Sequence, residues 1–158
     1  MPVSYHEYLF YSLCLRFGVP VISVRQDYKQ DIKQTGQLVK NFDFICHTKN
    51  KIYLIDVKGF SKLVGDSKVT IHDIKSLLTL EKLYGRKAKA LFVYVWVDED
   101  VPISKDVFTQ KFRIKAIEVS KFKKIARQQK GWKGWFYRCD KDKLKNIWEF
   151  FPQFKSNA

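Results

Sequence analysis

The chain has 158 residues, of which 46% are hydrophobic and 16% aromatic, so an intrinsically disordered chain is excluded and a single domain over residues 1–158 is predicted. Its 30 Lys and Arg against 16 Asp and Glu give a net charge of +14, which predicts a polyanionic partner, nucleic acid ahead of an acidic membrane surface. No apolar run approaches the roughly 20 residues of a membrane-spanning helix, and the first ten residues show no signal-peptide pattern. Cys14, Cys46 and Cys139 form no CxxC pair, which predicts reduced thiols, a cytoplasmic location and no zinc site. A membrane is not expected as a partner.

The first half of the chain predicts a helix and three strands. The helical pattern runs from Ser4 to about Phe17, and Gly18 is expected to end it. Residues 19–24 predict a short strand, and a polar, irregular stretch follows it. Two further strands are predicted around a short turn, over residues 38–46 and 51–59.

The second half begins with a helix that Thr70 is expected to cap and that runs to Tyr84. Continuous apolar residues over 90–97 indicate a strand buried on both faces. The elements predicted after it are a strand over 113–120, a basic helix from Ser120, a strand or hairpin over 131–138, and a last helix from Asp140 or Asp142 to about Phe151, ended by Pro152. This α-β-β-β-α-β order with additional C-terminal strands and helices predicts an α/β (α+β) fold with a mixed sheet.

Two aspartates interrupt the paired strands in NFDFICHTKNKIYLIDVKGF, residues 41–60. A two-residue turn at Lys49–Asn50 would place Asp43 directly opposite Asp56, on the same face and about 5 Å apart, whereas a turn of odd length would shift the pairing by one. Two carboxylates at that distance repel by about 3 kcal/mol at an effective dielectric constant near 20. A shared proton, the neighbouring Lys58 or a bound Mg²⁺ or Mn²⁺ would compensate. A surface hairpin with a simple Asp–Lys pair is the alternative.

The apolar residues of these strands predict which face is buried. Phe42, Phe44 and Cys46 alternate with the first aspartate and are expected to face the core together with Ile55 and Val57. The face that carries the carboxylates is then expected to open to a cleft.

These residues resemble a known nuclease motif. Asp43, followed on the next strand by Asp56-Val57-Lys58, resembles the D…(D/E)xK site of the PD-(D/E)xK nuclease superfamily, whose core also has the predicted order of elements. The segments YHEYLF, VKNFDFI, LIDVKGF, HDIKSLLTLEKLYG, ALFVYVWV and KGWKGWFYR together resemble the small HYExO family of predicted PD-(D/E)xK nucleases. Phe42 replaces the nominal proline of the superfamily, and Tyr5-His6 stand in the reverse of the family order before Glu7.

The resemblance implies a metal-dependent endonuclease that hydrolyses phosphodiester bonds, of DNA rather than RNA, by in-line attack of a metal-activated water and leaves a 5′-phosphate. Asp43, Asp56, Glu7 and the carbonyl of Val57 would hold Mg²⁺ or Mn²⁺, and Lys58 would position the water or stabilise charge in the transition state. Glu7 has an alternative role, because Ser4-x-x-Glu7 is also a capping box.

Two functions other than a nuclease are compatible with the sequence, and so is more than one oligomeric state. The main alternative is a non-catalytic nucleic-acid-binding module on the same fold, and the weakest is an anionic-lipid binder, for which a strongly amphipathic terminal helix is missing. The sequence does not fix the oligomeric state, and a homo-oligomer is compatible with it.

A basic stretch near the C-terminus predicts the surface that contacts nucleic acid. Residues 111–133 contain nine basic side chains and one acidic one, Glu118. The residues expected to contact phosphates, most of them on the basic helix, are Lys121, Lys123, Lys124, Arg127, Lys130 and Lys133. Aromatic rings over 131–138 could stack on bases, but Trp135 and Tyr137 are expected to pack inward. Minor candidates at the border of the cleft are Asp27, Lys29 and Gln34, and the acidic residues 98–100 predict a solvated loop.

Overall fold

The computed structural model describes residues 4–24, 33–34, 37–38, 42–60, 67–98, 111–131 and 134–157. The elements in chain order are α1 (Tyr5–Phe17), β1 (Val21–Ser23), β2 (Lys33–Gln34), β3 (Gln37–Leu38), β4 (Phe44–His47), β5 (Ile52–Phe60), β6 (Val69–Thr70), α2 (Ile71–Tyr84), β7 (Ala88–Val97), β8 (Phe112–Glu118), α3 (Val119–Ile125), β9 (Arg127–Gly131), β10 (Gly134–Arg138), η3 (Lys141–Lys143), β11 (Lys145–Asn146), η4 (Ile147–Glu149) and η5 (Pro152–Asn157), where η marks a 3₁₀ helix.

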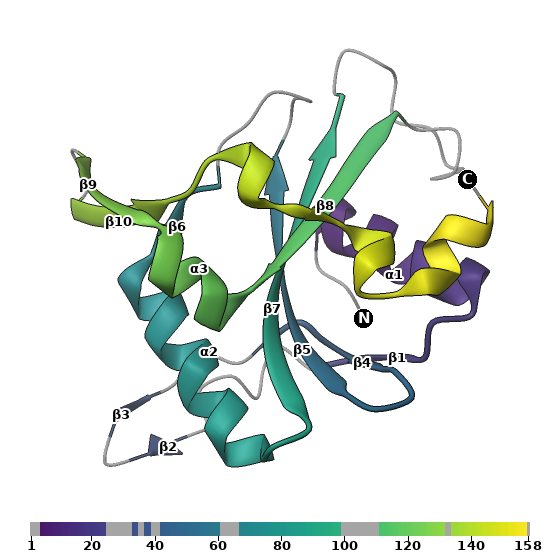
Figure 1. The fold of residues 1–158 in the computed structure, drawn as a ribbon, viewed down its shortest axis with the longest axis horizontal. Helices are drawn as coiled ribbons and strands as arrows, with labels where there is room; N and C mark the ends of the chain where they lie inside the picture. The colour runs from purple at the N-terminus through teal and green to yellow at the C-terminus, as the bar shows by residue number, and fades with distance from the viewer. Residues whose placement is uncertain are drawn as a thin grey trace.

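A six-stranded mixed sheet forms the centre, in the order β1-β4-β5-β7-β8-β11. β5 and β7 run parallel, and the other neighbours in this sheet are antiparallel. Helix α1 and the 3₁₀ helices η4 and η5 cover one face, while α2 and α3 cover the other (Figure 1). Residues 90–97 of β7 are all buried because both faces are covered, as their continuous apolar character predicts.

Capping residues fix the ends of the two long helices where the sequence predicts them. The Ser4 Oγ accepts a hydrogen bond from the Glu7 backbone N–H at 3.1 Å, and Gly18 ends α1 in the left-handed region with φ 74°. The Thr70 Oγ1 accepts a hydrogen bond from the Asp73 N–H at 3.2 Å and begins α2. Both predicted helices are therefore confirmed with their boundaries.

The predicted basic helix is shorter than its charge pattern indicates. It ends at Ile125, and Arg127–Gly131 form the strand β9 instead. Val119 and Phe122 are buried on α3, but residues 127–130 are all exposed and polar, so a longer helix would bury no further apolar surface. As a strand, the same residues gain backbone pairing with β10.

The predicted last helix is wrong, because two short 3₁₀ segments, η3 and η4, replace it with the strand β11 between them. Lys145 and Asn146 form the strand β11, which pairs with β8 and adds the sixth strand of the sheet. Asn146 and Glu149 form a capping box around η4, and Pro152 begins η5 rather than ending a helix. Pairing with a distant strand therefore overrides the local helical pattern.

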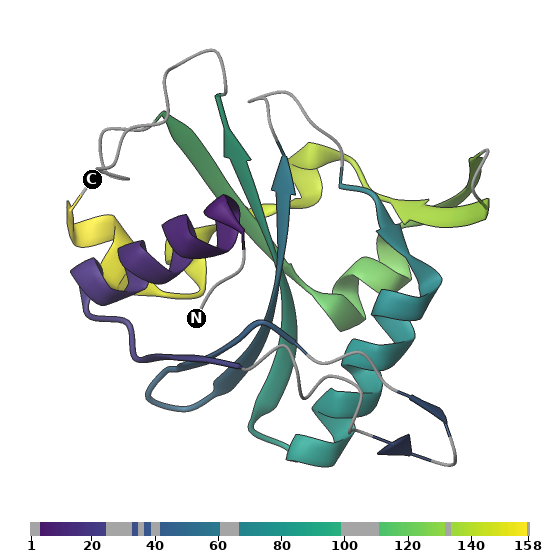
Figure 2. The same cartoon turned by 180° about the vertical axis from the view of Figure 1, so that it is seen from behind.

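A second, three-stranded sheet has the order β6-β10-β9. Its β9–β10 hairpin projects sideways from the body in both views (Figures 1 and 2). Across the ranges that the structure describes, no helix has the length and apolar character needed to cross a membrane.

Candidate active site

The turn between β4 and β5 has the predicted length and sets the predicted register. Phe44 pairs with Ile55, and His47 pairs with Ile52. The Thr48 N–H donates to the Lys51 carbonyl at 2.9 Å, which closes the turn over Lys49–Asn50. The register that brings Asp43 toward Asp56 is therefore confirmed over β4.

Regular pairing between β4 and β5 begins at Phe44 and does not include Asp43. Its backbone N–H donates to the Ile55 carbonyl at 2.8 Å, so Asp43 and Phe44 both face Ile55, which is the arrangement of a β-bulge. The Asp43 Oδ2 accepts a hydrogen bond from the Val57 N–H at 2.8 Å. The sequence predicts that Asp43 lies directly opposite Asp56. In the structure Asp43 lies instead beside the Asp56–Val57 peptide.

The bulge also reverses the side of the sheet on which Phe42 lies. Phe44, Cys46, Ile55 and Val57 pack on the α1 side, as predicted. Phe42 packs instead among the residues on the α2 side, so its predicted orientation is wrong. An extra residue in one strand shifts the alternation of side chains, which explains the difference.

Lys58 joins Asp56 to a third carboxylate that the sequence does not point to. Its Nζ lies 2.9 Å from the Asp56 Oδ2 and 2.5 Å from the Asp73 Oδ2 in the first turn of α2. In the sequence, Asp73 three residues after Thr70 is an ordinary helix-start carboxylate. The spacing of Asp73 could have indicated that it faces the sheet, because Leu77 and Leu80 follow it at four and seven residues, on the inward-facing side of the helix.

Burial and charge together fix the ionisation of Lys58. Asp43 is 4% exposed and Asp56 is 1% exposed. Burial by itself lowers the pKa of Lys58, but the Asp56 and Asp73 carboxylates outweigh burial and raise this pKa above its ordinary value. Lys58 is therefore an ammonium ion at neutral pH, and it pairs with both Asp56 and Asp73.

Helix α2 covers part of the carboxylate face, which is expected to open to a cleft. The Asp73 side chain of this helix contacts Lys58. The side chains of Lys58 and Asp73 are 19% and 12% exposed, so solvent reaches the cluster on their side. Asp43 and Asp56 are more deeply buried than these two side chains.

The predicted metal ligands are only partly brought together. Among the described residues, no three or more His, Cys, Asp and Glu side chains lie close enough to hold a metal ion, so Glu7 does not join both Asp43 and Asp56 here. The donor set still suits a hard divalent cation, since two carboxylates and the Val57 carbonyl offer only oxygen.

His6, beside Glu7, makes the contact between α1 and β5. Its Nε2 lies 3.0 Å from the Phe60 carbonyl oxygen. The ring lies against Gly59, where an added Cβ would be 2.3 Å from the His6 Cγ. His6 is thus a packing residue, and it holds the start of α1 against Gly59 and Phe60 of β5.

The predicted basic surface is exposed but spans two elements. Exposed side chains are those of Lys121, Lys123 and Lys124 on α3 and of Arg127 and Lys130 on β9. The expectation for Trp135 is wrong, because this ring is 55% exposed, whereas Tyr137 packs against the α2-side core as predicted. Outside the described residues lie Asp27, Lys29, Lys133 and residues 99–100; Gln34 lies in β2.

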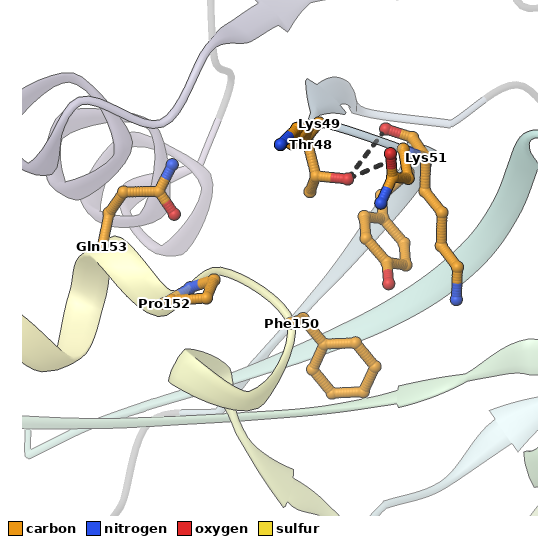
Figure 3. A pocket seen from close by; sticks show the side chains of 8 residues that line it. Thr48, Lys49, Lys51, Phe150, Pro152 and Gln153 are labelled. Carbon is orange, nitrogen blue, oxygen red and sulfur yellow. Dashed lines mark hydrogen bonds between the residues drawn. The ribbon is translucent and has the colours of Figure 1, made fainter.

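A cavity of about 470 Å³ lies away from these aspartates, at the β4–β5 turn (Figure 3). Its lining residues are Thr48, Lys49, Asn50, Lys51, Tyr53, Phe150, Pro152 and Gln153. None of the predicted site residues lines it.

Two solved structures were found to be similar, one of them with a TM-score above 0.5. A Holliday junction resolvase, Hjc, from the archaeal hyperthermophile Archaeoglobus fulgidus has a TM-score of 0.58 and 14% identity, over 92% of this chain and 96% of that chain. D212, a nuclease from a fusselovirus, has a TM-score of 0.48 and 14% identity, over 99% and 95%. No family model and no curated protein matches the chain. The α/β chain therefore has the restriction-endonuclease-like fold of PD-(D/E)xK nucleases.

Proposed function

We propose that this chain is a metal-dependent nuclease that hydrolyses phosphodiester bonds, with DNA as its preferred substrate and endonucleolytic cleavage as its reaction. One observation carries the proposal: where β4 leaves β5, Asp43 accepts a hydrogen bond from the Val57 N–H, and the neighbouring Asp56 and Lys58 form an ion pair, on a fold shared with a Holliday junction resolvase. Burying carboxylates costs free energy, so the burial of Asp43 and Asp56 indicates a purpose other than stability. Binding a cation and a phosphate is such a purpose.

The proposed metal is Mg²⁺ or Mn²⁺, held by Asp43, Asp56 and the Val57 carbonyl, with Glu7 completing the site. When bound, the ion would neutralise charge on the phosphate and make a coordinated water more acidic. Asp43 is already oriented for this role by the Val57 N–H, which fixes its carboxylate at the bulge. The bulge therefore preorganises one ligand before any ion is present.

The role proposed for Lys58 is that of a charged hydrogen-bond donor, not of a general base. Its raised pKa keeps the side chain protonated at neutral pH. An ammonium ion at the solvent-facing side of the cluster can donate to a phosphate oxygen on which charge develops in the transition state. The phosphate would approach from the side of Lys58 and Asp73, because these side chains reach solvent.

The exposed cations of α3 and β9 are proposed to hold the nucleic-acid backbone. They belong to a chain with a net charge of +14, which favours association with a polyanion at low salt. We expect the chain to act as a single domain in the cytoplasm, where its three free cysteines would stay reduced.

A cleavage assay tests the proposed function. Purified protein with Mg²⁺ or Mn²⁺ is incubated with linear, circular, single-stranded and branched DNA, and with RNA. We expect cleavage that EDTA abolishes and that Asp56→Asn reduces to background while circular dichroism shows an unchanged fold.

The burial of Asp43 and Asp56 favours one alternative, a non-catalytic nucleic-acid-binding module. Tight binding without cleavage of any substrate in the panel would establish the alternative and refute the nuclease.

A further inference from the structure

The β9–β10 hairpin presents an aromatic ring to solvent beside cations. Trp135 is 55% exposed and pairs across the hairpin with Lys130, so the indole and the ammonium lie on the same face. Strand β9 is the outer strand of its sheet, and residues 127–130 are exposed along it. The hairpin therefore offers a flat π surface next to positive charge.

The opposite face of the hairpin is rigidly packed. The Phe136 ring lies under the Lys68 Nζ, at 4.4 Å from the ring centroid, and near the Arg138 guanidinium, at 5.8 Å. The same ring covers Gly131, where an added Cβ would be 2.8 Å from the Phe136 Cε1. Phe136 thus serves the hairpin itself, whereas the Trp135 ring is directed toward solvent.

This hairpin is connected to the candidate active site by a short series of contacts. Phe136 pairs with Thr70 of β6. Thr70 caps α2, whose first turn carries Asp73, and Asp73 contacts Lys58. In both ribbon views the hairpin also lies at the level of the C-terminal end of β5 (Figures 1 and 2). The hairpin is therefore linked to Lys58 through Thr70 and Asp73.

We propose that the β9–β10 hairpin binds unpaired bases, so that the substrate class is nucleic acid with a single-stranded portion: a tail, a gap or a branch point. In this role Trp135 stacks on one unpaired base, and Lys130 contacts the adjoining phosphate. The reason is chemical: a lysine attracts any phosphate backbone, but an exposed indole gains free energy only from a base whose face is accessible. In a continuous duplex the base faces are covered by their neighbours.

This inference rests on the proposed nuclease function, and a binding experiment tests it separately from cleavage. The full chain in EDTA is titrated into a fluorescently labelled single strand and into a blunt duplex of the same length, with anisotropy as the readout. We expect Trp135→Ala to weaken single-strand binding roughly 5- to 100-fold, the range for one lost base–aromatic stack, and to change duplex binding less than about twofold.

Three variants keep the result interpretable. Trp135→Phe retains an aromatic ring and should recover most of the single-strand affinity. Trp135→Thr removes the ring but favours a strand, so it repeats the test if the alanine variant unfolds. Trp148→Ala removes another exposed indole, 39% exposed in η4, and should change neither affinity.

Equal losses on both substrates, or no loss on either, would overturn the stacking proposal. If the wild-type chain cleaves nucleic acid in Mg²⁺ while Trp135→Ala binds normally, the inference fails and the nuclease stands. If the wild-type chain neither binds nor cleaves any nucleic acid, both are refuted.

Discussion

At the scale of single residues, Lys58 has the largest effect on the candidate site. It holds together two carboxylates from different elements, Asp56 of β5 and Asp73 of α2, at 2.9 and 2.5 Å. Carboxylates in a low-dielectric environment repel strongly when no cation lies between them. The lysine therefore stabilises the fold, and it would compete with the proposed metal for the same oxygens.

Lys58→Met tests both roles. We expect it to lower the free energy of unfolding by about 2 kcal/mol, because it leaves buried carboxylates without their cation, with a partial discount for solvent access. Mg²⁺ should then raise the melting temperature of the variant more than that of the wild type, since the oxygens no longer face an ammonium. Thermal melts with and without Mg²⁺ measure this.

Lys51→Met serves as the control for the lost charge, because this lysine is largely exposed and its contact with Glu118 is 4.0 Å long. It should leave stability and its Mg²⁺ dependence nearly unchanged. A Lys58→Met variant as stable as the wild type, with no response to Mg²⁺, would contradict this account of the cluster.

The thiols offer a second prediction at this scale. All three cysteines are buried, and burial together with a hydrogen bond to Cys46 raises the pKa of Cys14 far above its ordinary value. Only the thiolate is nucleophilic, so we expect the native chain to react very slowly with Ellman's reagent and to react rapidly in guanidinium chloride. Fast reaction of a thiol in the native chain would show that the described core opens readily.

At the scale of elements, the bulge at Asp43 decides where the site residues meet. Beyond it, β5 continues to Phe60 while regular pairing with β4 has ended. The Val57 N–H is therefore available to the Asp43 side chain, which accepts its hydrogen bond. The divergence of two neighbouring strands thus creates the place for a carboxylate inside a sheet.

The contact between α1 and β5 can be tested at Gly59. Gly59→Ala would place a Cβ 2.3 Å from the His6 Cγ, and the ring is held by its contact with the Phe60 carbonyl. We expect a loss of about 2 kcal/mol in unfolding free energy from this overpacking, measured by urea denaturation.

A double-mutant cycle provides the control. His6→Ala combined with Gly59→Ala removes the clash, so the double variant should be more stable than the sum of the single effects predicts. Strictly additive effects would mean that His6 and Gly59 do not touch.

The elements that sequence predicts correctly are those fixed by local chemistry. Ser4 and Thr70 cap their helices, and the turn at Lys49–Asn50 fixes the register of β4 and β5. The bulge, β9 and β11 were missed because each depends on pairing with a strand elsewhere in the chain. Asp73 was missed for a related reason, since its partner Lys58 comes from another element.

At the scale of the whole molecule, positive charge is concentrated on α3 and β9. Lys121, Lys123 and Lys124 are exposed on α3, and Arg127 and Lys130 are exposed on β9. This surface adjoins the hairpin that carries Trp135, so electrostatic attraction and base stacking would act on the same strand of nucleic acid.

Lys124→Glu tests this surface. We expect it to weaken binding of all nucleic-acid sequences alike and to reduce the slope of log affinity against log salt by about one, because a phosphate contact is lost. Titrations at several salt concentrations measure the slope.

Lys49→Glu makes the same change in net charge at the exposed β4–β5 turn, away from the basic surface. It should change the slope much less than Lys124→Glu. Equal slopes for the two variants would place the contact surface elsewhere.

The two-residue turn at Lys49–Asn50 has a consequence for how related sequences can differ. β5 is paired with β7 along its whole length, so one inserted residue in the turn would displace β4 instead. Phe44 and Ile45 would exchange faces, and Asp43 would move about 3.3 Å from the Val57 amide. Two inserted residues would preserve the faces of Phe44 and Ile45 and the position of Asp43 beside the Val57 amide. Among relatives that keep the aspartate pair, we therefore expect the length of this turn to vary in steps of two.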